Sequence, residues 1–314
     1  MKYADAGGTT FSRGLRRFGD EHMTVQTAHG ENSVVTRALA TIGDIATLPE
    51  VTVKIIELVE DPNSTARDLH GVIKTDPALS AKVLKVVNSA FYGLPGQIAS
   101  VDRAIVLLGM SAVKNIAVAA SIARLFKSGR MSEQFTAKDL WRHSVAVGVA
   151  AKLLSKAAGQ QAVMDEVFLA GLIHDIGILV ERQVAPDKLK EVITRCSKGE
   201  GSFLDLENQI IGADHQAFGD ALTTKWKFPR HLRAVVGFHH FPERLSNELQ
   251  TLGYTIQLAD ALCCQEKLGF YVTSGGSPGI EELFEIQGIS LDLREELIES
   301  LHTDLAEAER VLIG

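Results

Sequence analysis

Histidine and aspartate are the residues whose types and spacing in this sequence suit catalysis or metal binding. The chain has 10 histidines, and five of them stand in one arrangement along its second half: His143, His174, His215, His239 and His240. Two carboxylates occur inside apolar stretches, Asp175 directly after Leu172-Ile173-His174 and Asp260 within Leu258–Leu262. An ionised carboxylate in such surroundings costs free energy unless a cation or hydrogen bonds compensate it. Because imidazoles and carboxylates bind Zn, Mn and Fe, the pattern predicts a divalent metal site.

The alternative for any single histidine is a hydrogen-bonded core residue. We adopt this alternative for three of them: His70, His231 and His302. To explain the cluster in this way, five histidines would each have to be an independent core residue, and two aspartates would have to be buried without a cation. On a helix, His239 and His240 would project about 100° apart and reach a site against the same helix edge. Asp139 precedes His143 by four residues and shares its helix face.

Length and composition place the chain among globular proteins. It has 314 residues, 46% hydrophobic and 23% charged, which excludes disordered, collagenous and coiled-coil chains. The longest apolar runs, such as Asn115–Ala123, are too short to span a membrane, and the first thirty residues contain no apolar signal segment. The net charge of −7 disfavours nonspecific binding to nucleic acid or acidic lipid. The sequence thus predicts neither membrane association nor direct nucleic-acid binding.

Three cysteines are too few for a disulfide framework, so the expected location is the reducing cytoplasm. Cys196 lies in a charged helix end. Cys263 and Cys264 lie on an apolar helix, where we interpret them as small core residues rather than nucleophiles.

Helical periodicity dominates the chain, and the expected fold class is all-α, a multi-helix bundle. Residues 1–32 hold five glycines in a polar stretch and are predicted to form a flexible leader. Residues 36–128 are expected to form an amino-terminal bundle of short helices. A capping box at Thr65–Asp68 and the Asp76-Pro77 pair mark two of the helix starts. Ser128-Gly129 marks a break before the second half.

The second half, residues 139–265, must position the metal-site residues on helices. The predicted helices there are Asp139–Lys156, Met164–Ile176, Asp187–Ser197, Phe203–Ile211, Asp214–Lys225, Arg230–Phe241 and Leu249–Gln265. Residues 266–314 are expected to add a loop and two further helices. We find no internal repeat with a period of 20–50 residues.

The order His143, then His174-Asp175, then Asp260 resembles the signature of the HD superfamily of metal-dependent phosphohydrolases. The upstream half resembles the HD-related output domain (HDOD) family of bacterial signalling proteins, over roughly residues 36–245. The motifs that carry this second resemblance are Leu48-Pro49, Thr75–Leu79, Val87–Ala90, Tyr92-Gly93, Ser100-Val101, Ala104-Ile105 and Leu108-Gly109.

The resemblance implies a ligand set for two divalent ions, with Fe, Mn and Zn as the candidates. His143, His174, Asp175 and Asp260 match the ligands of the first metal. His215, His239 and His240 match the extra histidines of the two-metal branch that cleaves cyclic dinucleotides. Asp175 takes the bridging place, its implied catalytic role being to hold a metal hydroxide. Asp139 matches an acidic position that touches a third metal in some relatives.

Two departures from the active branch bear on turnover. A lysine follows the His-Asp pair in that branch, whereas Ile178 stands here, and its alkyl chain cannot polarise phosphate. The Gly-Tyr-Pro element after the histidine pair is absent, since Phe241-Pro242-Glu243-Arg244 follows His240. We therefore expect little or no cleavage of cyclic diguanylate. A metal-bound hydroxide could still attack another phosphoester, which needs only the ligands and an open face.

Three functional hypotheses follow. The first is a cytoplasmic bacterial signal-transduction output protein with an HD-type two-metal site, which binds a phosphorylated ligand or nucleotide with weak or no turnover and acts on other signalling proteins. The second is an active metal-dependent phosphohydrolase or phosphodiesterase on a nucleotide or cyclic dinucleotide. The third is a non-catalytic protein–protein interaction module, in which the histidines are structural.

Overall fold

The computed structural model describes residues 33–42, 48–61, 63–89, 91–126, 129–160, 163–274 and 278–313. Every named element in these ranges is an α-helix or a 3-10 helix, so the all-α prediction is confirmed. None of the helices in these ranges is both long enough and apolar enough to cross a membrane. The predicted leader, residues 1–32, lies outside the described residues.

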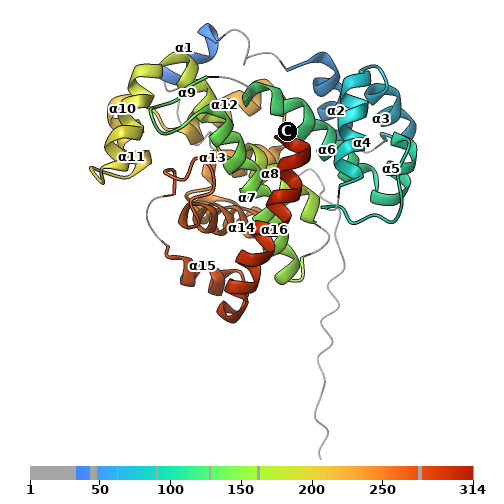
Figure 1. The fold of residues 1–314 in the computed structure, drawn as a ribbon. Coiled ribbons are helices and arrows are strands. Elements are labelled where there is room, and N and C mark those ends of the chain that lie inside the picture. The colour runs from blue at the N-terminus through green and yellow to red at the C-terminus, as the bar shows by residue number, and fades with distance from the viewer. Residues whose placement is uncertain are drawn as a thin grey trace, which may run out of the picture. The chain divides into compact units, whose positions relative to one another are not determined.

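Short helices form the first part of the chain, grouped to one side in Figure 1 apart from α1. They are α1 (Ser33–Thr41), α2 (Glu50–Glu60), α3 (Ala66–Ile73), α4 (Pro77–Val87), α5 (Val101–Leu108) and α6 (Met110–Ile122). Helix α6 is buried along most of its length and contacts α2, α3, α4 and α5. Helix α1 packs against α9 and α12, helices of the second half of the chain.

Local signals in the sequence define the helix starts in this bundle. The Thr65 hydroxyl accepts from the Asp68 amide, and Asp68 Oδ2 accepts from the Thr65 amide at 2.9 Å, which confirms the capping box. The Asp76 carboxylate caps α4 by accepting from the Leu79 amide at 2.9 Å. After α4, the Asn88 side chain donates to the Ile98 carbonyl at 2.8 Å and accepts from the Ile98 amide at 2.6 Å. Asn88 thereby fixes the loop that leads into α5.

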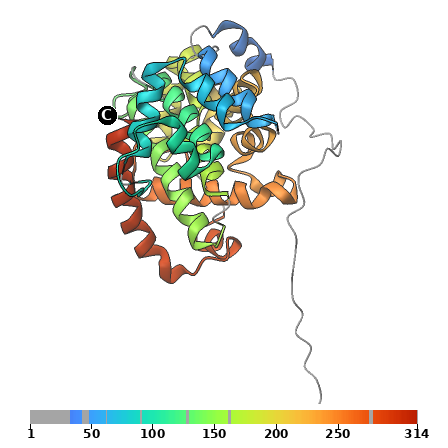
Figure 2. The same cartoon turned by 90° about the vertical axis from the view of Figure 1, so that its right-hand side faces the viewer.

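The second part of the chain holds the remaining helices, of which α7, α14 and α16 are the longest (Figures 1 and 2). They are η2 (Ala123–Phe126), α7 (Ala137–Ala157), α8 (Met164–Ile173), α9 (Gly177–Val184), α10 (Pro186–Ser197), α11 (Phe203–Ile210), α12 (His215–Lys225), α13 (Arg230–Phe238), η4 (Pro242–Arg244), α14 (Asn247–Gln265), α15 (Ile280–Ile286), η5 (Leu291–Leu293) and α16 (Arg294–Leu312). Helix α7 lies at their centre and packs against α8, α14 and α16. Helix α8 also contacts α6 and so joins the two halves.

The carboxyl-terminal helix is fastened to α7 by two polar contacts. The indole Nε1 of Trp141 donates to the Leu312 carbonyl at 3.0 Å in a buried position. Arg142, the next residue, forms a salt bridge with Glu309. Helix α16, which the sequence predicts over Leu293–Leu312, therefore belongs to the packing of α7.

Two predicted helices end earlier than expected. Residues His174–Ile176 form a turn, so the predicted helix Met164–Ile176 is divided into α8 and α9. Helix α13 ends at Phe238, and His239 and His240 follow it in a turn, so the prediction that both lie on one helix is wrong. In each case the helix ends at a histidine that belongs to the buried cluster described below. A Cβ atom on Gly177 would collide with the carbonyl oxygen of His215, so glycine is required for the close approach of α9 to α12.

Candidate metal centre

The seven residues predicted as metal ligands converge in the interior of the second half. They come from separate elements: His143 from α7, His174 and Asp175 from the turn after α8, His215 from the start of α12, His239 and His240 from the turn after α13, and Asp260 from α14. All seven are buried, and the greatest exposed fraction among them is 8%, at His240. Their donor atoms fall into groups within 4.8 Å of one another.

The first side of the cluster contains His143, His174 and Asp260. His143 Nε2 lies 3.1 Å from Asp260 Oδ1, and His174 Nε2 lies 3.9 Å from the same oxygen. The Nδ1 atoms face backbone carbonyls, Leu268 at 3.1 Å for His143 and Gly171 at 2.7 Å for His174. Because a carbonyl only accepts, each Nδ1 must carry the proton. In the neutral imidazole each Nε2 therefore presents a lone pair to the centre.

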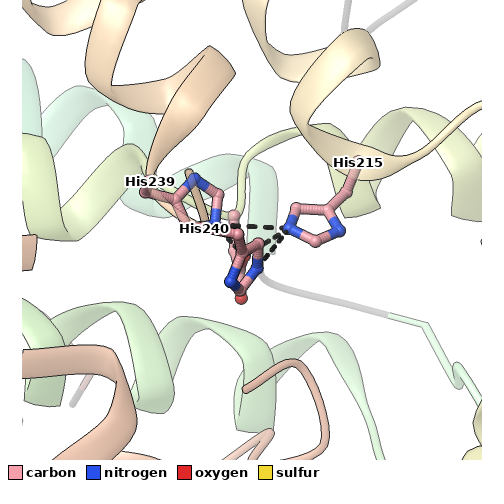
Figure 3. Close-up of side chains that lie close together, drawn as sticks. His215, His239 and His240 are labelled. Atoms are coloured by element: carbon pink, nitrogen blue, oxygen red, sulfur yellow. Dashed lines mark hydrogen bonds and ion pairs between the residues drawn. The ribbon is translucent and has the colours of Figure 1, made fainter. Parts of the chain in front are cut away.

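The second side contains three histidines, shown in Figure 3. His215 Nε2 lies 3.3 Å from His239 Nε2 and 3.2 Å from His240 Nε2. The Nδ1 of His239 faces the Val236 carbonyl at 3.1 Å, and that of His215 faces the Glu207 carboxylate at 2.9 Å. Both Nε2 atoms are thus directed at each other with lone pairs when the rings are neutral. Such convergence repels unless a cation lies between the nitrogens, so these residues fit a divalent ion.

Asp175 lies between the two sides and directs one oxygen at each. Its Oδ2 lies 3.3 Å from His174 Nε2 and 3.8 Å from His143 Nε2. Its Oδ1 lies 3.3 Å from His215 Nε2 and 3.5 Å from His239 Nε2. The side chain is fully buried, and neither oxygen makes a hydrogen bond of good geometry within the described residues. A carboxylate held in this way has the arrangement of a ligand that bridges two cations.

Electrostatics keep the carboxylates of the cluster ionised but do not act alike on its histidines. Burial opposes protonation of His174, but attraction to Asp175 outweighs it and raises the pKa of His174. Burial opposes ionisation of Asp175, but attraction to His174 outweighs it and holds the pKa of Asp175 well below its ordinary value. Burial likewise opposes ionisation of Asp260, yet the hydrogen bond with His143 lowers the pKa of Asp260. Burial and repulsion by His239 lower the pKa of His240 well below its ordinary value. Ionised carboxylates and neutral imidazoles are the forms that bind metals.

Glu207 is a functional residue that the sequence reasoning missed. It is fully buried on α11 and accepts a hydrogen bond from His215 Nδ1, which fixes the ring so that Nε2 faces the cluster. Glu181 on α9 is also fully buried, and burial together with the Glu207 charge raises the pKa of Glu181 well above its ordinary value. Glu207 follows Phe203 by four residues, on the apolar stripe of its helix. An acidic residue on such a stripe was the available signal.

Two residues singled out from the sequence lie elsewhere. The Asp139 carboxylate caps α7, because its Oδ2 accepts from the Thr136 amide and hydroxyl at 2.7 Å each. Asp139 belongs to none of the groups of converging metal ligands found among the described residues, and its third-metal role stays a prediction. Ile178 is fully buried on α9. A lysine in its place would have to bury its charge.

The site has little contact with solvent. His240 and the neighbouring Gln257 are each 8% exposed, so this edge of the cluster reaches the surface. The Gln216 side chain accepts from the His240 amide at 3.1 Å, and Gln257 Nε2 donates to the His240 carbonyl at 3.1 Å. Both amides hold the backbone of His240 at the edge of the cluster.

Comparisons with known proteins agree with this architecture. A protein of Treponema pallidum (strain Nichols), named only as uncharacterized, is 26% identical over 219 residues, which are 70% of this chain and 42% of that relative. The chain thus spans less than half the length of this relative. The crystal structure of an HDOD domain protein of unknown function from Geobacter sulfurreducens superposes with a TM-score of 0.74 at 22% identity, covering 89% of this chain and 97% of that one.

A second crystal structure, of a provisionally named phosphohydrolase from Shewanella amazonensis SB2B, gives a TM-score of 0.69 at 22% identity and covers 89% of this chain and 98% of that one. At these identities the two structures show the fold. The family model described as the HDOD domain matches residues 45–242, more than half of the sequence. The chain therefore belongs to the HDOD domain family.

Proposed function

We propose that this chain is a signal-transduction output protein whose His/Asp cluster binds two divalent ions and, through them, a phosphorylated ligand or nucleotide, with weak or no turnover. The observation that carries the proposal is the buried Asp175 carboxylate. Its two oxygens face separate sets of histidines at 3.3 Å and lack hydrogen bonds of good geometry within the described residues. Two cations would compensate this charge and the converging imidazole lone pairs.

The residues divide the work of such a site. His143, His174 and Asp260 would hold one ion, and His215, His239 and His240 the other, with Asp175 shared. Glu207 orients His215, and the surrounding burial excludes water. When bound, divalent ions supply Lewis acidity toward phosphate oxygens. His240, at the edge of the site, is the ligand best placed to meet a molecule from solution.

Two features favour binding over fast turnover. Every ligand is at least nine-tenths buried, which leaves little open face for a substrate and an attacking group. Ile178 provides no cation for a phosphate oxygen. Loss of one such electrostatic contact lowers the rate by roughly 10²–10³-fold in enzymes. A cytoplasmic location and partners among signalling proteins, both expected from the sequence, belong to the same proposal.

Metal analysis of the purified protein tests the proposal. We expect about two equivalents of Fe, Mn or Zn per chain, a lower melting temperature after chelation, and binding of phosphate compounds only by the metal-loaded protein. A stoichiometry near zero, with no change on chelation, would favour the protein–protein interaction module. Rapid hydrolysis in a screen of nucleotides and cyclic dinucleotides would favour the phosphohydrolase instead.

A further inference from the structure

Cys264 lies beside the first side of the metal centre, although the sequence reasoning treated it as a core residue. It follows Asp260 by one turn of α14, and its Sγ donates a hydrogen bond to Asp260 Oδ1 at 3.3 Å. The same Oδ1 lies 3.1 Å from His143 Nε2. Sulfur, oxygen and nitrogen donors of these three residues all lie within 4.8 Å of one another.

A second observation points to a ligand at the same place. His174 Nε2 and Asp175 Oδ2 are fully buried and lack hydrogen bonds of good geometry within the described residues. They lie 3.3 Å apart, and His174 Nε2 is 3.9 Å from Asp260 Oδ1. His174 Nε2 thus lies beside the same Asp260 oxygen that Cys264 contacts.

The spacing of the donors suits a small divalent ion. With metal–sulfur bonds near 2.3 Å and metal–nitrogen and metal–oxygen bonds near 2.1 Å, neighbouring ligands of a four- or five-coordinate ion lie roughly 3.0–3.4 Å apart for nitrogen and oxygen and roughly 3.1–3.6 Å apart for sulfur and oxygen. The observed separations, 3.1 Å for His143 to Asp260 and 3.3 Å for Cys264 to Asp260, are close to these values. Thr273 Oγ1, on the loop after α14, lies 3.8 Å from the sulfur.

Building on the proposed function, we propose that Cys264 is a thiolate ligand to the ion held by His143 and Asp260. Binding would release the thiol proton to solvent, and a sulfur lone pair would form the metal bond. A thiolate favours Zn²⁺, Fe²⁺ or Co²⁺ over Mg²⁺ and Mn²⁺, whose preferred ligands are oxygens. The first side of the centre is accordingly selective for a thiophilic divalent ion.

Cys263 provides a matched control. It is the preceding residue of α14, it is fully buried, and its side chain projects about 100° away from that of Cys264. The metal-free protein and its Cys264→Ser and Cys263→Ser variants are titrated with Co²⁺ and followed by absorption. We expect a near-ultraviolet thiolate-to-cobalt charge-transfer band in the unsubstituted protein and in Cys263→Ser, and loss of that band in Cys264→Ser. The visible ligand-field absorption of histidine-bound cobalt persists in all three.

Each contrary outcome has a separate meaning. Visible cobalt absorption without a charge-transfer band in the unsubstituted protein overturns the assignment of Cys264 but leaves the metal centre intact. The absence of any cobalt absorption overturns both proposals. If Cys264→Ser fails to fold, alkylation of the unsubstituted protein decides the question by peptide mapping. Zinc must then protect Cys264, and equal labelling of Cys264 with and without zinc overturns the assignment.

Discussion

The two halves of the molecule differ in whether their buried charged side chains have hydrogen-bond partners. In the amino-terminal bundle, the interior is apolar, and the buried Lys114 donates to the Leu58 carbonyl and to Ser64 Oγ, so protein atoms satisfy it. In the second half, Asp175 is fully buried, and its carboxylate oxygens lack hydrogen bonds of good geometry within the described residues. A buried charge with protein partners stabilises a fold. A buried carboxylate surrounded by imidazole nitrogens instead indicates a ligand.

The largest expected effect on metal content comes from Asp175→Ala. Removal of the shared carboxylate should deplete both ions, because its two oxygens face both sets of histidines. Metal at 100 times its dissociation constant should stabilise the unsubstituted protein by about 2.7 kcal/mol and leave the variant unchanged. Elemental analysis and thermal unfolding measure both effects. His231→Ala and His302→Ala, outside the cluster, serve as controls, and equal metal loss in them would contradict the assignment.

A substitution in the apolar half should give the reverse pattern. Ile55 on α2 is fully buried, and Ile55→Ala should lower the free energy of unfolding by about 2–5 kcal/mol because it leaves a cavity. Metal stoichiometry should stay the same, since α2 packs against α3 and α6, away from the ligands. Denaturant unfolding and elemental analysis of the folded variant test this separation of roles. Metal loss in folded Ile55→Ala would show that the two halves are not independent.

Glu207→Ala tests the orientation of His215. Loss of a carboxylate that holds a metal-binding histidine typically weakens metal binding by about 10–100-fold, and we expect this range for the second ion. Glu207→Gln, which can still accept from Nδ1, should recover part of the affinity. Competition with a chelator measures the dissociation constants. Glu200→Gln, at an exposed ion pair with Arg195, is the matched control. An unchanged affinity in Glu207→Ala would rule out the orienting role.

The smallest effect concerns pH. The pKa of Glu181 is raised by burial above its ordinary value of 4.5, so in the window above pH 4.5 the folded chain keeps a proton that the unfolded chain releases. This contribution to stability is complete below pH 4.5 and is lost as pH rises through the folded pKa, with a slope of at most about 1.4 kcal/mol per pH unit. Glu181→Gln should make the decline of unfolding free energy with pH shallower. Denaturant unfolding across pH 5–8, with exposed Glu191→Gln as control, tests this expectation.

The helix starts could be predicted from the sequence where residues within one turn of the start determine it. The Thr65–Asp68 box and the Asp76-Pro77 start were both readable from the sequence. The ends of α8 and α13 were not, because His174–Ile176 and His239-His240 leave the helical path for tertiary contacts that periodicity does not contain. Propensity is outweighed there by the geometry of the buried cluster.

The seven candidate ligands could be predicted because polar residues in apolar stretches, together with the motif resemblance, mark them. Cys264 could not be predicted as a candidate in this way, because a cysteine in an apolar stretch has the composition of a core residue, and only its 3.3 Å contact with Asp260 distinguishes it. Asp139 lies one helical turn from His143, as expected, yet its carboxylate is used for capping. Spacing along a helix predicts the face on which a side chain lies, but it does not predict the group to which that side chain hydrogen-bonds.

The contacts between α7 and α16 have a thermodynamic consequence. Trp141 and Arg142 hold the carboxyl-terminal helix, and the next residue, His143, is one of the proposed ligands of the centre. Any displacement of α7 that accompanies ion or phosphate binding changes the free energy of the α7–α16 interface. Linkage is reciprocal, so a macromolecule that binds α16 more tightly in one of these positions alters the affinity of the buried centre by the same factor. A partner of α16 would in that case act on the centre as well as respond to it.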